Sequence, residues 1–199
     1  MANTGVANVP ILKRRKNDEY HEKLEKTYYW DFIHSADYHY FVSRVLFLHY
    51  VALYAQFSAY QCVENYLKAY LKYHERVPPN SHNLQELLKL CHDQERSGES
   101  FITSDNLSII ITKYEPFYEL PRYPAQKQLP EKGYSFLIPD DIYILDYFVM
   151  RMRQILPVPT NASDIFRATH FELHLCQQNC PNFYSTFLAN NINFVEKSH

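Results

Sequence analysis

The feature that most constrains the fold is the stretch from Ser35 to His74, which contains neither glycine nor proline. Apolar residues recur along it at intervals of three and four, the pattern of an amphipathic helix. One unbroken helix of this length would measure about 60 Å at 1.5 Å per residue, which is too long for a domain of this size. We therefore predict two antiparallel helices with a break near Leu48–Val51. The two apolar series are Tyr38, Phe41, Val42, Val45 and Leu46, and then Ala55, Ala59, Cys62, Val63, Tyr66, Leu67, Tyr70 and Leu71.

A shorter third helix is predicted after this pair. Pro78 and Pro79 end the second helix, because proline cannot continue a helix and restricts the residue before it. Asn83 can cap the next helix, since Glu86 follows three residues later at the spacing of a capping box. The apolar stripe of this helix consists of Leu84, Leu87, Leu88 and Cys91.

Two more helices are predicted on either side of a proline-marked stretch. Ser104 can cap a helix that runs to Tyr114, and Asp140 opens a well-patterned helix that Pro157 ends. Acidic residues in the first turn of the second of these and basic residues in its last turn complement the helix dipole. Its apolar positions are Ile142, Leu145, Val149, Met152 and Leu156.

The sequence divides into three parts. Residues 1–17 lack periodicity and are predicted to be a flexible tail, 18–156 form a helical bundle, and 157–199 form a helical extension packed on it. The extension holds one or two short helices, at about 163–178 and 182–188. The chain has only 3 glycines against 11 prolines, which favours helices joined by proline-marked loops over a strand-rich fold.

Three elements of the chain resemble, in order and spacing, the signature of the HEPN family (higher eukaryote and prokaryote nucleotide-binding domain). They read Ser58-Ala59-Tyr60-Gln61-Cys62-Val63-Glu64-Asn65-Tyr66-Leu67-Lys68-Ala69, Ser81-His82-Asn83-Leu84 and Arg122-Tyr123-Pro124. Cys62 replaces the alanine that is usual in the family. The resemblance covers about residues 35–156. It implies an all-α fold, an antiparallel four-helix up-and-down bundle with extra short helices that is often dimeric.

A polar face on the second helix is the candidate ligand site. Gln61, Glu64 and Lys68 lie on neighbouring turns of one face, and Arg122 and Tyr123 of the third element can complete a shallow polar site. Glu64 and Lys68 are four residues apart in the order that favours an ion pair. A salt bridge at the surface with no ligand is the alternative interpretation.

Many HEPN proteins resemble metal-independent RNases, which carry Arg-x4-6-His near the start of the last bundle helix. A histidine there can move the 2′-hydroxyl proton, and the arginine can stabilise charge on the phosphate. No histidine occurs between His92 and His170, so Arg122 has no downstream partner. Arg76 and His82 fit the spacing but span a different loop. They are the candidate catalytic residues, and the alternative is that His82 orders the loop.

A second group of residue types suggests a metal site near the C-terminus. His170 and His174 are one helical turn apart, and Cys176 and Cys180 follow. On a continuous helix the two cysteines would lie roughly 160–200° away from the histidines at about 100° per residue. We therefore expect core or surface residues here, and no metal or other cofactor. Three isolated glycines also exclude a glycine-rich phosphate loop.

The net charge of −2 and the pI of about 6.5 argue against binding to double-stranded DNA. The local basic run Lys13-Arg14-Arg15-Lys16 is interpreted as part of a solvated tail. No signal peptide or membrane-spanning run is present, and the four cysteines do not form a disulfide scaffold, so a cytoplasmic protein is expected.

We therefore predict a non-catalytic HEPN-like protein, as a homodimer, that binds a nucleotide, an RNA or a protein partner. The resemblance implies a nucleotidyltransferase as one such partner. Two alternatives stay open. One is a metal-independent endoribonuclease of the toxin–antitoxin type, and the other is a purely structural or interaction module.

Overall fold

The computed structural model describes residues 19–20, 22–94, 110–111, 113–117, 140–157 and 177–193, and these contain helices and no strand. The all-α prediction is therefore confirmed. The helices are α2 (Tyr29–Leu48), α3 (Ala52–Tyr73), α4 (Leu84–His92), the 3-10 helix η1 (Glu115–Phe117), α6 (Asp140–Ile155) and α8 (Pro181–Leu188). The predicted tail and most of the predicted helices at 104–114 and 163–178 lie outside the described residues. The predicted boundary between bundle and extension stays a prediction.

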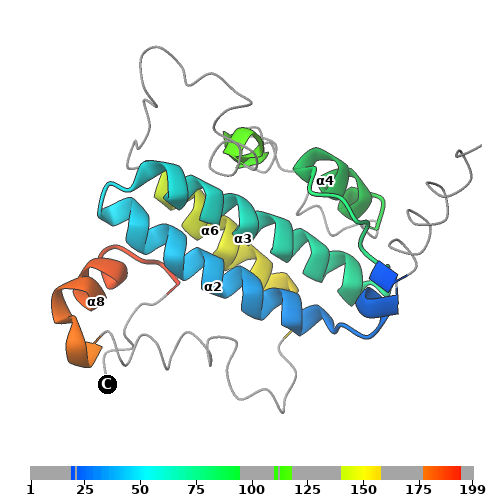
Figure 1. The fold of residues 1–199 in the computed structure, drawn as a ribbon, viewed down its shortest axis with the longest axis horizontal. Helices are drawn as coiled ribbons and strands as arrows, with labels where there is room; N and C mark the ends of the chain where they lie inside the picture. Colours follow the sequence, from blue (N-terminus) through cyan, green and yellow to red (C-terminus); the bar gives the residue numbers. More distant parts are fainter. Residues whose placement is uncertain are drawn as a thin grey trace, which may run out of the picture.

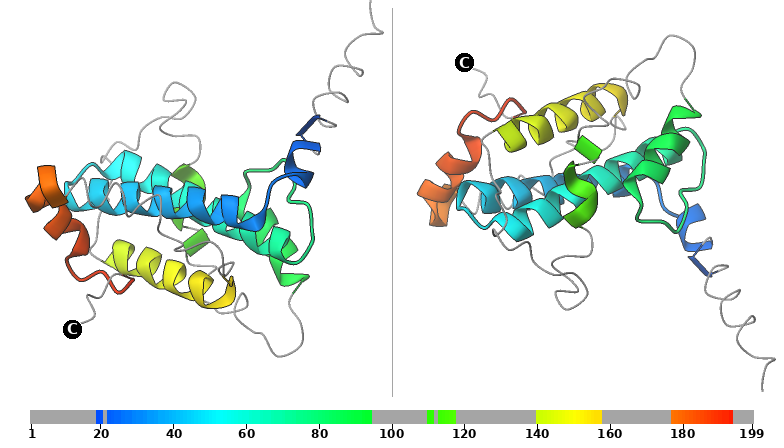
Figure 2. Two further views of the ribbon diagram at one scale, coloured as in Figure 1. Left: turned by 90° about the horizontal axis from the view of Figure 1, so that it is seen from below. Right: turned by 90° about the horizontal axis from the view of Figure 1, so that it is seen from above.

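The helices α2 and α3 form a long antiparallel hairpin, and α6 lies across it as a second layer (Figures 1 and 2). The short helices α4 and α8 lie at opposite ends of this bundle, α4 against α3 and α8 against α2 (Figure 1). We call these the α4 end and the α8 end. None of the described helices is long and apolar enough to cross a membrane.

The break between α2 and α3 falls where the sequence predicts it, although no glycine or proline is present. Tyr50 takes the left-handed conformation with φ of 62°. The N–H of Val51 donates to the carbonyl of Leu46, and the N–H of Tyr50 donates to that of Phe47. These are the two hydrogen bonds of a Schellman motif, which normally places glycine at the left-handed position. The chain therefore turns through backbone hydrogen bonding and not through a special residue.

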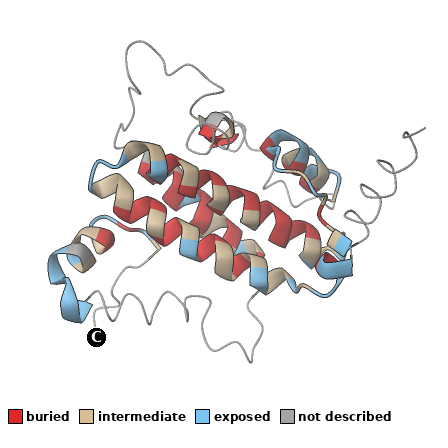
Figure 3. Cartoon of the chain, viewed as in Figure 1, coloured by how far each residue is buried: buried red, intermediate tan, exposed pale blue. Residues whose placement is uncertain are grey.

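The predicted start of α4 and the predicted start and end of α6 are also confirmed. The side chain of Asn83 accepts a hydrogen bond from the N–H of Glu86 at 2.8 Å, so it caps α4 as expected. The helix α6 begins at Asp140 and ends before Pro157. The buried faces of α2, α3 and α6 point toward one another (Figure 3). Cys62 and Cys91 are buried thiols within this core, as predicted.

Candidate functional site

Glu64 and Lys68 form a buried ion pair on α3 at the α4 end. Lys68 Nζ donates to Glu64 Oε1 at 2.7 Å, which confirms the predicted pairing. The pair is not on the surface, because the side chains of Glu64 and Lys68 are only 4% and 7% exposed. A buried charged pair has lost its hydration and depends on the hydrogen bonds that its surroundings supply. Glu64 therefore holds the Lys68 ammonium group in place through one of its three N–H donors.

His82 joins this pair from the loop that precedes α4. Its Nδ1 lies 2.9 Å from Glu64 Oε1, the same oxygen that accepts from Lys68, and its side chain is 46% exposed. Glu64 Oε2 is buried and has no hydrogen-bond partner among the described residues. A buried carboxylate oxygen without a donor costs about 1–3 kcal/mol or more. Glu64 Oε1 thus contacts two side chains, whereas Glu64 Oε2 contacts no donor among the described residues.

The charge of Glu64 acts on groups from three other segments. Burial raises the pKa of the Glu115 carboxyl, hydrogen bonds from the backbone of Leu84 and Gln85 oppose this, and Glu64 adds to the rise. Burial raises the pKa of the Tyr20 hydroxyl, and Glu64 again adds to it. Burial lowers the pKa of His39, and the negative charge of Glu64 opposes that shift. Glu64 is therefore an electrostatic centre of the α4 end.

The start of α4 is occupied by the protein's own carboxylate. Glu115 of η1 accepts a hydrogen bond from the N–H of Leu84 at 2.9 Å. A helix N-terminus favours a negative charge, and Glu115 supplies one. Ligand phosphate binding at this helix end would have to displace Glu115, so we do not assign it there.

The other predicted site residues are less closely gathered. Gln61 is half-buried on α3, one turn before Glu64. Arg76 reaches toward the end of α4, where it donates to the carbonyl of Leu90 at 3.5 Å. Arg122 and Tyr123 lie outside the described residues. The structure thus brings together Glu64, Lys68 and His82, which sequence reasoning had assigned to two separate sites.

The predicted metal residues are mostly not described. His170, His174 and Cys176 lie outside the described residues, and Cys180 is an exposed free thiol just before α8. Within the described ranges no group of three or more histidine, cysteine, aspartate or glutamate residues is arranged to hold a metal ion.

Two buried ion pairs between α2 and α6 were missed by sequence reasoning. Asp37 pairs with Arg153 at 2.7 Å, and Arg44 pairs with Asp146. On each helix an aspartate precedes an arginine by seven positions, and each aspartate pairs with the arginine of the other helix. The pattern fixes α6 antiparallel to α2. Its sequence signal is the repeated Asp-x6-Arg spacing on otherwise apolar faces.

A buried tyrosine hydrogen-bonds to each ion pair, and the two pairs form one polar layer because the Arg153 guanidinium lies over the Tyr40 ring, 5.9 Å from its centroid. The Tyr66 hydroxyl donates to Asp37 Oδ1, and Arg153 Nε donates to the Tyr66 oxygen at 3.2 Å. The Tyr40 hydroxyl shares its proton between Asp146 Oδ1 at 2.6 Å and Asn191 Oδ1 at 2.8 Å. Burial raises the pKa of both tyrosine hydroxyls well above the usual value.

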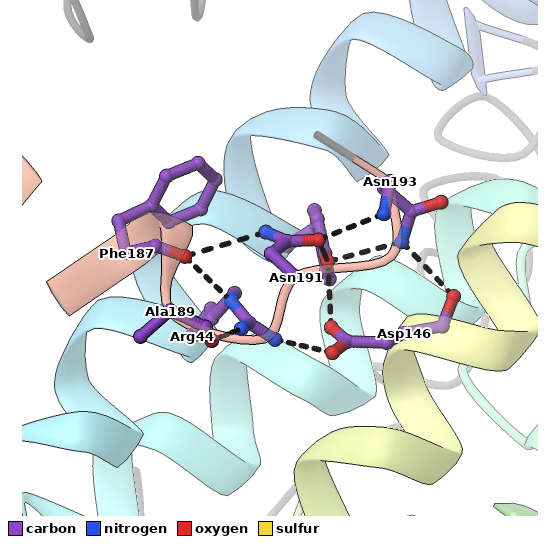
Figure 4. A network of polar contacts seen from close by, with 7 residues as sticks. Arg44, Asp146, Phe187, Ala189, Asn191 and Asn193 are labelled. Atoms are coloured by element: carbon purple, nitrogen blue, oxygen red, sulfur yellow. Dashed lines mark hydrogen bonds and ion pairs between the residues drawn. The ribbon is translucent and has the colours of Figure 1, made fainter. Parts of the chain in front are cut away.

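The segment around α8 completes this layer (Figure 4). Arg44 Nε donates to the carbonyl of Phe187 at 2.8 Å, and Arg44 Nη2 donates to the carbonyl of Ala189. Asn193 Nδ2 donates to the carbonyl of Asp146 at 3.0 Å. Burial raises the pKa of the Asp146 carboxyl, while the Arg44 charge opposes the shift. Both oxygens of Asp146 have a donor, in contrast to those of Glu64.

The arrangement defines an all-α module with a buried polar site at each end. A family model described as HEPN domain matches residues 29–140, which is more than half of the chain. The chain therefore belongs to the HEPN domain family, and the resemblance given by its three sequence elements is confirmed. The match begins at the first residue of α2 and ends at the first residue of α6. Comparisons with curated proteins and with solved structures gave no match.

Proposed function

We propose that this protein is a non-catalytic HEPN module that binds a nucleotide, free or within RNA, at the Glu64 site of the α4 end. The observation that carries the proposal is Glu64 Oε2, a buried carboxylate oxygen that has no donor among the described residues. It lies on the same carboxylate that His82, a half-exposed side chain, contacts from the loop. A ligand N–H or O–H group placed beside Oε2 would satisfy this acceptor.

Nucleotides match this chemistry because the base and the ribose, their two uncharged parts, both carry hydrogen-bond donors. The base amino groups of adenine, guanine and cytosine and the ribose hydroxyls can each donate to a carboxylate. Lys68, also a proposed ligand residue, uses one of its three N–H donors on Glu64, so the phosphate calls for a further cation beside it. We assign this role to Arg122, and the adjoining contacts to Gln61 and Tyr123.

Titration with AMP, GMP and a short single-stranded RNA, followed by calorimetry, tests the proposal. Glu64→Gln retains the shape of the side chain but replaces one acceptor by a donor, and Arg122→Ala removes the phosphate contact. Each is expected to weaken binding at least about tenfold, which corresponds to about 1.4 kcal/mol. Lys89→Ala, an exposed change on α4, is the matched control and should bind as the wild type does. Equal affinity in all four proteins, or no binding by the wild type, would overturn the proposal.

A metal-independent endoribonuclease of the toxin–antitoxin type is the second candidate, and one contact favours it. Glu64 Oε1 lies against Nδ1 of His82 at 2.9 Å. A carboxylate on one ring nitrogen orients an imidazole so that its other nitrogen can act as a base. Arg76, at the start of the same loop, would then stabilise phosphate charge.

An RNA-cleavage assay in the presence of a chelator distinguishes the two candidates. The enzyme should lose cleavage with His82→Ala and slow markedly with Glu64→Gln and Arg76→Ala. If the wild type binds RNA without cleaving it, the endoribonuclease is excluded and the binding module stands.

The homodimer and the nucleotidyltransferase partner implied by the resemblance are part of the same proposal. Light scattering of the purified chain, alone and with a nucleotidyltransferase, tests them.

A further inference from the structure

The helix α8 is held at its C-terminal end by a residue of another helix. The last carbonyls of any helix lack intrahelical donors, and a cation near them is favourable. The last turn of α8 contains no basic residue. Arg44 of α2 supplies the missing cation, because its guanidinium donates to the carbonyls of both Phe187 and Ala189. The Arg44 side chain thus binds the C-terminus of α8 through the backbone carbonyls of that helix end.

Side chains of the same segment add specificity to this contact. Phe187 is 1% exposed and packs edge-on against Phe41 and Tyr40, with ring centroids 5.0 and 6.4 Å apart. Past the helix end, Asn191 and Asn193 both meet the Tyr40 hydroxyl, at 2.8 and 3.1 Å. A buried aromatic anchor, a guanidinium on carbonyls and paired amides are features by which proteins recognise a peptide.

The α8 segment is too short to form a stable helix by itself, so its helical conformation depends on the residues that it packs against. It spans only 8 helical residues, and helices shorter than about 12–15 residues are marginal in water. Among the described elements it packs chiefly on α2. It lies outside the HEPN match at 29–140, whereas Tyr40, Phe41 and Arg44 lie within it. A segment outside the match therefore covers three residues that lie within it, together with Asp146 of α6, which also lies outside the match.

We propose that Tyr40, Phe41, Arg44 and Asp146 form a recognition site for the C-terminal end of a short helical peptide, and that α8 with residues 189–193 is its built-in occupant. The ligand class is a peptide with a phenylalanine just before the last helical residue and asparagines three and five residues after that residue. The occupant is detachable, so the site binds the same peptide when it is supplied separately. This proposal is independent of the Glu64 site.

A binding experiment with a synthetic peptide of residues 181–193 tests this site. The full-length variant Phe187→Ala/Asn191→Ala/Asn193→Ala removes the ring and amide contacts of the built-in segment with Tyr40 and Phe41 and leaves the receptor residues intact. Calorimetry should show that the peptide binds this variant at least about tenfold more tightly than it binds the wild type, whose site is occupied. A peptide that carries Phe187→Ala should not bind. Equal binding of both peptides, or no binding to a variant that retains wild-type circular dichroism, would overturn the site.

A second measurement applies if the triple variant loses its helical signal. The isotope-labelled wild type is titrated with unlabelled peptide, and the amide resonances of residues 187–193 are followed. We expect the peptide at millimolar concentration to shift these resonances toward those of an undocked segment. Resonances that stay unchanged at that concentration would show that the segment is a fixed part of the core and not a ligand.

Discussion

The two ends of the α2–α3 hairpin solve the burial of charge in different ways. At the α8 end, Arg44 donates to a carboxylate and to two carbonyls, and both oxygens of Asp146 have donors. At the α4 end, Glu64 Oε1 serves both Lys68 and His82, while Glu64 Oε2 has no partner among the described residues. At the α8 end the protein itself supplies a donor to each oxygen of the buried carboxylate. At the α4 end one carboxylate oxygen has no donor among the described residues. This difference is the reason for placing the proposed ligand site at the α4 end and not at the α8 end.

The number of hydrogen bonds to the buried charges determines how much stability a substitution removes. A buried ion pair contributes little compared with well-packed apolar residues, but its loss on one side only leaves an uncompensated buried charge. The α8 end should therefore be sensitive to single substitutions and tolerant of paired ones. The α4 end should be less sensitive, because one oxygen of the Glu64 carboxylate has no donor among the described residues in the native protein either.

The largest effect is expected from Arg44→Ala at the α8 end. The variant leaves the Asp146 carboxylate buried without its partner and removes the donor that holds the end of α8. We expect a loss of about 3–5 kcal/mol in the free energy of unfolding. Urea denaturation followed by circular dichroism measures it.

The paired replacement Arg44→Met/Asp146→Leu serves as its control. Since no charge is left unpaired, this double variant should lose clearly less stability than Arg44→Ala, although the carbonyls of α8 still lose their donor. If the double variant is as unstable as the single one, the ion pair is not the source of the sensitivity.

A matched pair of carboxyl-to-amide changes compares the two ends directly. Asp146→Asn removes the counter-charge of Arg44 and should lower the free energy of unfolding by about 3 kcal/mol. Glu64→Gln also leaves a buried cation, Lys68, without its counter-charge, but it removes a carboxylate oxygen that has no donor among the described residues, so we expect a smaller loss of about 1 kcal/mol. Both are measured by the same urea titration. Equal losses would contradict the view that the α4 end is incompletely satisfied.

The positions of the helices could be predicted from the sequence, whereas the buried layer of charged residues could not. Apolar periodicity located α2, α3, α4 and α6, and the length argument placed the break at Leu48–Val51. The same periodicity leaves out Asp37 and Arg44, because a charged residue is normally assigned to solvent. Their burial depends on α6, more than one hundred positions later. Only the repeated Asp-x6-Arg spacing signalled it.

The candidate site was predicted in part for a related reason. Helical spacing alone placed Glu64 and Lys68 on one face and paired them. Their burial and the approach of His82 depend on how the loop before α4 folds back over α3, which is a tertiary contact across eighteen positions. A local pattern cannot report a contact of that kind, so His82 was assigned to a separate catalytic pair with Arg76.

A smaller effect is expected from glycine at the two left-handed turns, one at each end of the hairpin. Tyr50 has φ of 62° and Glu75 has φ of 59°. The left-handed conformation costs a non-glycine residue about 1–2 kcal/mol, and the greater freedom of glycine in the unfolded chain cancels part of the gain. Tyr50→Gly and Glu75→Gly should each stabilise the protein by up to about 1 kcal/mol, seen as a rise in Tm.

The two turns act as controls for each other. The side chain of Tyr50 is 87% exposed, so little packing is lost with it. A gain at both turns would show that their strain is a general feature of the hairpin. A loss at Tyr50 alone would indicate that its ring has a packing role at the α8 end.

The smallest effect is a pH dependence that belongs to the α4 end. Burial lowers the pKa of His39 in the folded protein, so near pH 6.5 the unfolded chain binds more protons than the native one. Stability should therefore rise as the pH rises from below the folded pKa to about 6.5, and level off above it. His39→Gln should flatten this part of the curve, measured as the urea midpoint at several pH values.

The charge of Glu64 sharpens this last test, because it opposes the shift of His39. In Glu64→Gln that opposition is lost, so the pKa of His39 falls further and the rise of stability with pH becomes steeper. In Asp146→Asn, at the other end, the slope due to His39 should stay as in the wild type, because Asp146 is not among the groups that shift His39. A slope that changes equally in both variants would mean that the two ends are electrostatically coupled, and the separation between a saturated and an unsaturated end would then fail.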